Sequence, residues 1–227
     1  MSEIKIQKTK DFVINFLANE NSGHGFDHIE RVYKNAVKLA KEEEADLFLV
    51  SLASLLHDVD DEKIVGEECA KKLRNTRKFL SELDLSNDIS DTICEIINTM
   101  SYSKSLEGIV PTTLEGKIVS DADKLDAIGA IGTIRTLIYA AHKKKPIFLS
   151  DEFPTVKISK KEYRSKSRTN DTAINHFFEK LLLLKNMMYT SSGKKEAEIR
   201  HHFMTEFLKQ FFKEQGYDNW IELLKEF

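Results

Sequence analysis

The sequence has few of the residues that cross-link a chain or anchor it in a membrane. Only two of its 227 residues are cysteines, Cys69 and Cys94, which excludes a disulfide framework and a four-ligand zinc set. No run of 18 apolar residues is present, so we expect no membrane span. The N-terminal segment also lacks the apolar core of a secretory signal. Together these absences predict a cytoplasmic protein.

Proline is also scarce, and its distribution favours helices. The three prolines, Pro111, Pro146 and Pro154, lie in the middle of the sequence and leave two long tracts without a helix breaker. Apolar residues in these tracts fall at helical intervals, with little alternation of the β type. The sequence therefore predicts an all-α fold in a single domain, residues 1–227. We expect helices at about 8–19, 27–44, 46–58, 66–83, 87–100, 114–144, 171–190, 194–215 and 218–225, with irregular connections at 100–113 and 145–169.

The net charge of −3 is small but unevenly distributed. Residues 142–168 contain nine lysines and arginines against three acidic residues, so this segment carries +6 and the rest of the chain carries −9. An acidic chain with a single basic loop offers no general attraction to nucleic acid. A cationic loop on an acidic body suits a small phosphorylated molecule, and a solvated basic loop is the alternative.

One apolar helix ends in a group of polar residues that needs a partner. Leu52–Leu56 run directly into His57 and Asp58, and Asp60, Asp61 and Glu62 follow. A helix this apolar is normally buried, and polar groups at its end are costly to bury unless their charge is balanced. Imidazole and carboxylate are ordinary ligands of a divalent cation, and the negative end of a helix dipole favours a cation. We therefore predict a metal site here.

Two further segments supply matching ligands. His28 lies in the first turn of an earlier helix, and Asp123 lies in a later helix among small and apolar residues. Two imidazoles and two carboxylates would leave positions of an octahedral metal open for water and a phosphate oxygen. A hydrolytic metal site needs this arrangement, because the cation polarises the phosphoryl group and lowers the pKa of bound water.

The order of these residues, H…HD…D, resembles the HD-domain superfamily of metal-dependent phosphohydrolases. Three flanking phrases are similar to those of small, single-domain bacterial HD hydrolases and extend the resemblance over nearly the whole chain: HGFDHIERV at 24–32, DADKLDAIGAIG at 121–132 and NHFFEKLL at 175–182. The resemblance implies an all-helical HD fold. Its metal-ligand core would span about 24–130, its basic loop about 143–169 and its C-terminal helices about 170–227.

The resemblance also implies an activity and a cofactor. Characterised relatives cut nucleoside triphosphates to monophosphate and pyrophosphate, often with manganese. We therefore expect one divalent ion, manganese or magnesium, on His28, His57, Asp58 and Asp123, with nickel, cobalt or iron as alternatives. Nucleoside monophosphate or alarmone hydrolysis at the same site stays open, as does a metal- or nucleotide-sensing module without catalysis. Two-metal HD phosphodiesterases are disfavoured, because no histidine lies between His57 and Asp123. The oligomeric state is left open.

The acidic residues after the HD pair are candidate catalytic groups. Asp61 is four residues after His57, so both face the same side if the helix continues. By resemblance, Asp61 matches the carboxylate that activates water in HD nucleotidases, and Asp61-Glu62 is similar to the acidic pair of alarmone hydrolases. The alternative is that Asp60, Asp61 and Glu62 begin a solvated loop.

Five basic or imidazole side chains are candidates for contacts with substrate. His24 lies one turn before His28, and Arg31 could reach phosphate or pair with a carboxylate on a nearby helix. The others are expected on one later helix, where a cationic pair would stabilise the charge of phosphoryl transfer, or would form an exposed polar stripe. These three residues are His176, Lys180 and Lys185.

Overall fold

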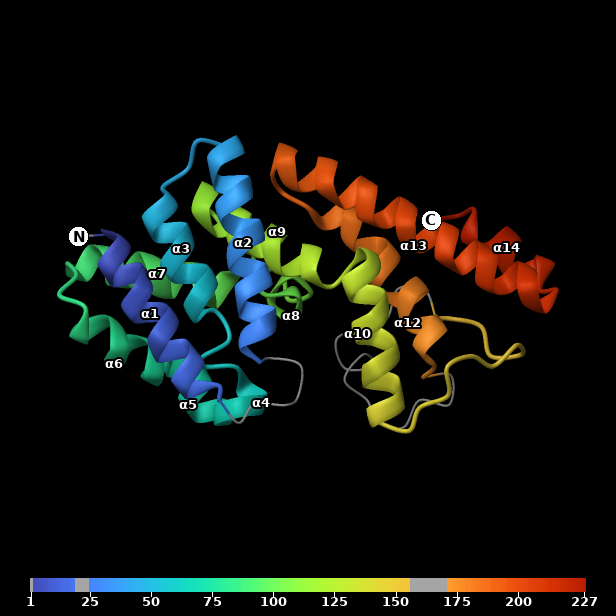
Figure 1. Cartoon of the computed structure of the whole chain (residues 1–227), viewed down its shortest axis with the longest axis horizontal. Coiled ribbons are helices and arrows are strands. Elements are labelled where there is room, and N and C mark those ends of the chain that lie inside the picture. Colours follow the sequence, from blue (N-terminus) through green and yellow to red (C-terminus); the bar gives the residue numbers. More distant parts are fainter. Residues whose placement is uncertain (1, 19–24, 156–170) are drawn as a thin grey trace. The chain divides into compact units, whose positions relative to one another are not determined.

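The computed structural model describes residues 2–18, 25–155 and 171–227 (Figure 1). All regular structure in these ranges is helical, which confirms the predicted all-α fold. The chain divides into two compact units, residues 1–123 and 124–227, with the boundary inside helix α9. None of the helices in these ranges combines the length and apolarity needed to cross a membrane.

The first unit is built around α3. This helix packs against α1, α2 and α7 (Figure 1). Every residue from Val50 to Leu56 is buried. Asp46 begins α3 by accepting hydrogen bonds from the backbone N–H groups of Phe48 (2.8 Å) and Leu49 (3.0 Å). The helices of this unit are α1 (Ser2–Phe16), α2 (Phe26–Glu42), α3 (Leu47–Leu56), α4 (Glu62–Val65), α5 (Glu67–Lys72), α6 (Arg74–Glu82), α7 (Asn87–Thr99), α8 (Tyr102–Ser105) and most of α9 (Leu114–Asp126).

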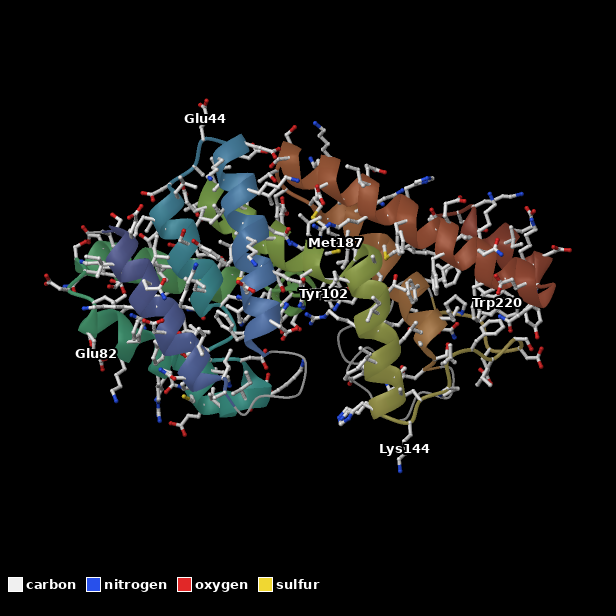
Figure 2. The ribbon with its side chains drawn as sticks, in the orientation of Figure 1. Glu44, Glu82, Tyr102, Lys144, Met187 and Trp220 are labelled. Atoms are coloured by element: carbon white, nitrogen blue, oxygen red, sulfur yellow. The ribbon has the colours of Figure 1, made fainter. Side chains whose placement is uncertain are left out.

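The second unit packs around the long helix α13. An aromatic cluster surrounds Trp220, which Figure 2 labels. The Trp220 ring stacks on Phe153, with ring centroids 4.9 Å apart, and on Phe212, with centroids 5.3 Å apart. Its indole N–H donates to the carbonyl of Ser150 (3.1 Å), so the loop after α10 is fixed to this cluster. The elements are α10 (Gly129–His142), α12 (Ala173–Glu179), the 3₁₀ helix η1 (Leu181–Met187), α13 (Ser191–Gln215) and α14 (Asp218–Leu224).

Three helices predicted as continuous are interrupted. The predicted helix 66–83 breaks at Leu73, which is left-handed (φ 47°) and separates α5 from α6. The predicted helix 114–144 breaks before Gly129, whose φ of 75° lies outside the helical region. The predicted helix 171–190 ends at Glu179, because Lys180 leaves the helical region (φ −142°) and the chain continues as a 3₁₀ helix.

Other predicted boundaries were closer. The helices predicted at 27–44, 87–100 and 218–225 each agree with the structure to within two residues at either end, whereas α1 and α13 begin earlier than expected. The connection predicted as irregular at 100–113 contains the short helix α8, which Ser101 caps. Helix α3 ends at Leu56, two residues before the expected end, so His57 and Asp58 lie in the turn that follows the helix.

Candidate metal centre

Four side chains in the first unit form the candidate centre, and three segments of chain supply them. His28 lies in the first turn of α2 and is buried. His57 and Asp58 occupy the turn that follows α3 and are also buried. Asp123 lies in the last turn of α9. The sequence predicted these four residues, and the structure brings them together.

The ligand atoms face one another at short range. The Nε2 atoms of His28 and His57 are 3.3 Å apart. His28 Nε2 lies 3.5 Å from Asp58 Oδ2 and 3.6 Å from Asp123 Oδ1. His57 Nε2 lies 3.6 Å from Asp58 Oδ1 and 3.9 Å from Asp123 Oδ1. Each imidazole nitrogen therefore lies within 4 Å of an oxygen of both carboxylates. The tightest group is His28, His57 and Asp58, whose ligand atoms all lie within 4.8 Å of one another.

The tautomer of His57 gives this cluster a nitrogen lone pair. His57 Nδ1 is 2.7 Å from the carbonyl oxygen of Ser54, one turn earlier in α3, so Nδ1 carries the proton and donates it. In a neutral ring, Nε2 then holds a lone pair that faces the cluster. Histidine ligands of metals are commonly oriented by this kind of bond to a backbone carbonyl. A nitrogen lone pair next to carboxylate oxygens is stabilised by a positive ion, so the donor set fits a divalent cation.

Comparison with known proteins agrees with this geometry. The model of the HD domain matches residues 25–128, a range that contains all four side chains. The protein YpgQ of Bacillus subtilis is 32% identical over 216 residues, which cover 94% of this chain and 96% of YpgQ. The chain belongs to the HD domain superfamily of hydrolases.

Solved structures similar to this chain extend over almost its whole length. A protein from Lactobacillus plantarum has a TM-score of 0.81 at 37% identity, covering 95% of this chain and 98% of its own. An HD-superfamily hydrolase from Bacillus thuringiensis has a TM-score of 0.74 at 37% identity, covering 95% and 99%. YpgQ, crystallised in complex with ADP, has a TM-score of 0.74 at 31% identity, covering 94% and 97%.

The acidic residues after the HD pair are placed differently from the expectation. The shared face of Asp61 and His57 required the helix to continue; α3 ends at Leu56 and His57–Asp60 form a turn, so that condition is not met. Asp61 instead caps α4, with Oδ1 accepting from the backbone N–H of Lys63 (2.8 Å). Glu62 is the exposed first residue of α4. A catalytic role for Asp61 or Glu62 stays a prediction.

Asp60 is the residue of this HD segment that sequence reasoning missed. The expectation allowed it only as the start of a solvated loop, but Asp60 is 5% exposed and accepts hydrogen bonds from three N–H donors near the start of α6. A run of acidic residues gives no signal that one member is buried. The contact is made across 15 residues, so no local pattern reveals it.

The first two substrate candidates lie beside the HD histidine. His24 falls outside the described residues. Arg31 Nη1 makes an ion pair with Asp27 Oδ2 on its own helix (2.9 Å). Its contact with phosphate stays a prediction.

The other three substrate candidates belong to the second unit. They were expected on one helix, but the structure places them on more than one element. His176 is in α12, Lys180 follows its last residue and Lys185 is in η1. Lys185 Nζ lies 3.2 Å from Nε2 of His201. Burial, followed by the charge of Lys185, lowers the pKa of His201 below its usual value, so the neutral ring accepts this hydrogen bond. Substrate binding by the three candidates stays a prediction.

Proposed function

We propose that this HD hydrolase acts on nucleotides and converts a nucleoside triphosphate to the monophosphate and pyrophosphate. The observation that carries the proposal is that the imidazole nitrogens of His28 and His57 face each other, with carboxylate oxygens of Asp58 and Asp123 within 4 Å of both. These residues would hold a single divalent cation, with manganese or magnesium favoured. When bound, such an ion polarises a phosphoryl group and lowers the pKa of a coordinated water.

Two observations support a nucleotide as the substrate. YpgQ, which shares 32% identity with this chain, was crystallised with ADP, and ADP contains the base, ribose and first two phosphates of a nucleoside triphosphate. The chain also carries its excess positive charge in one segment, residues 142–168. Lys144 belongs to this segment, two residues after the end of α10, and its side chain projects away from the ribbon (Figure 2). Clustered cations attract polyphosphate by long-range electrostatics.

The residues of the chain have defined tasks in this reaction. Water attacks the α-phosphorus and forms a new P–O bond, while the bond from the α-phosphorus to the oxygen bridging to the β-phosphate breaks. Asp61 accepts the proton of the attacking water or orients that water, and pyrophosphate leaves. His176 and Lys180 would offset the negative charge that spreads over the phosphoryl oxygens.

The decisive experiment is a panel of nucleoside triphosphates, nucleoside monophosphates and alarmone, incubated with manganese, magnesium, cobalt or nickel. Products are separated by chromatography. Pyrophosphate and monophosphate from a triphosphate support the proposal. Orthophosphate from a monophosphate, or pyrophosphate from the alarmone, would support the alternative hydrolase activities. Metal binding with no turnover over the whole panel would favour a sensing module.

A further inference from the structure

The carboxylate of Asp60 connects the turn of the metal ligands to a helix that contributes no ligand. Its Oδ1 accepts from the backbone N–H of Asn75 (3.1 Å) and from the side-chain amide of Asn75 (2.8 Å). Its Oδ2 accepts from the backbone N–H of Thr76 (2.8 Å). Both oxygens are therefore engaged in a buried environment, where charge-assisted hydrogen bonds are strong.

These bonds take the place of a missing helix cap. Helix α6 begins at Arg74, and the residue before it, Leu73, is left-handed and provides no capping side chain. The first N–H groups of a helix have no partner within the helix, and a capping oxygen normally serves the second or third of them. Asn75 and Thr76 occupy these two positions. Asp60 thus caps α6 from 15 residues upstream in the chain.

Helix α6 is itself held firmly in the first unit, so it can serve as an anchor. Phe79 and Leu80 of α6 are buried. The Phe79 ring stacks on Phe12 of α1, with ring centroids 4.1 Å apart and planes 9° apart. Helix α1 packs in turn on α3, the helix that ends beside the metal ligands.

The turn between α3 and Asp60 leaves the ligands little freedom. The N–H of Val59 donates to the carbonyl of Leu56 (3.1 Å), and the N–H of Asp61 donates to the carbonyl of Asp58 (3.0 Å). His57 and Asp58 therefore lie between the rigid end of α3 and the anchored carboxylate of Asp60. Ligand sites gain affinity when the ligands are held in place before the ion arrives.

We propose that Asp60 is a positioning residue for the metal centre: by capping α6, it holds the HD turn so that His57 and Asp58 present their ligand atoms to one cation. The inference rests on the proposed metal site. The competing explanation is that Asp60 serves only the stability of α6, and the two differ in what happens to metal affinity.

The test measures manganese affinity by titration calorimetry, well below the melting temperature, with the folded fraction checked by circular dichroism. Asp60→Ala should weaken manganese binding by about 10-fold to 100-fold, the range seen for residues that orient metal ligands. Asn75→Ala, which leaves both backbone donors to Asp60, should weaken it several-fold. Ser86→Ala removes the cap of α7 (Oγ to the N–H of Ile89, 3.4 Å) and is the matched control, so its affinity should equal that of the wild type.

A double-mutant cycle sharpens the test. If Asn75 acts through Asp60, then Asn75→Ala should lower manganese affinity in the wild-type background and have no further effect in the Asp60→Ala background. Amide hydrogen exchange of the metal-free protein gives an independent readout. The N–H of Thr76 should exchange faster in Asp60→Ala than in the wild type, because it has lost its acceptor.

The outcomes separate the inference from the proposed function. If the wild type binds manganese and the affinity of Asp60→Ala is within two-fold of the wild-type affinity, the positioning role is overturned and Asp60 is a cap alone. No binding of manganese, magnesium, cobalt or nickel by the wild type would overturn the proposed function and the inference with it. If Asp60→Ala does not fold, Asn75→Ala decides the question by the same two-fold criterion.

Discussion

Replacing Asp58 by asparagine tests the metal centre directly. The change removes one of the two carboxylates and keeps the size of the side chain. Asp58 Oδ2 lies 3.5 Å from His28 Nε2, and Oδ1 lies 3.6 Å from His57 Nε2, so both oxygens face the cluster. Without a cation, a buried amide is less costly than a buried carboxylate. We therefore expect the chelator-treated variant to lose no more than about 1 kcal/mol of unfolding free energy, a typical effect of a single substitution.

The loss should appear only when metal is added. An ion present at 100 times its dissociation constant stabilises the folded state by about 2.7 kcal/mol. In a chain of this size, that corresponds to a rise in melting temperature of roughly 5–11 °C. Loss of a direct ligand should weaken binding at least as much as loss of an orienting residue, by about 100-fold. The same metal concentration would then add only about 0.4 kcal/mol, or roughly 1–2 °C.

Thermal melting followed by circular dichroism, with manganese or with EDTA, measures both quantities. The matched control is Asp27→Asn, the same chemical change one residue before His28 at a side chain that is 77% exposed. Asp27→Asn should keep the full manganese-induced rise. If Asp58→Asn also kept the wild-type rise, Asp58 would not be a ligand and the assignment of the centre would be wrong.

Three further predictions concern pH and stability. The pKa of His201 is lowered from 6.5, so the unfolded chain binds more protons than the folded chain as pH falls below that value. The unfolding free energy from urea titrations should therefore fall as pH decreases below about 6.5. His201→Gln should reduce this dependence, whereas His202→Gln, at an exposed neighbour, should not. Asp46→Ala removes the cap of α3 and should lower the unfolding free energy by about 1–2 kcal/mol in urea titrations. Gly132→Ala would place a Cβ 2.1 Å from the carbonyl oxygen of Ala127, so it should lower the unfolding free energy by about 3 kcal/mol or more in urea titrations. An unfolding free energy equal to that of the wild type would contradict this packing.

The four side chains of the candidate metal centre could be selected from the sequence because their chemistry is carried by residue type and order. Imidazole and carboxylate groups at the end of an apolar helix need a cation wherever that helix lies. The burial of α3 could be predicted in the same way, since Leu47–Leu56 are nearly all apolar and leave no polar face for solvent. In both cases the information is local.

The breaks in the longer helices could be predicted only in part. The predicted helix 114–144 breaks just before Gly129, and a glycine inside a helical pattern is a recognised warning of a break. Gly129 is needed because its φ is 75° and a Cβ there would lie 3.0 Å from the side chain of Arg200. The break at Leu73 has no such signal, because leucine rarely adopts a left-handed conformation.

Asp60 and Asp61 show why local spacing fails where a helix ends. Counting four residues from His57 selected Asp61 as the neighbour of the site, which requires α3 to continue through the HD pair. The helix stops at Leu56, and the adjacent carboxylates then separate: Asp61 caps α4, whereas Asp60 is buried against α6. What distinguishes them is a hydrogen bond to a segment 15 residues away, and tertiary contacts of this kind override helical periodicity. A chain with the same HD pair but no acceptor at the position of Asp60 would need another contact to hold this turn, so the ligand motif alone does not determine how rigidly the ligands are held.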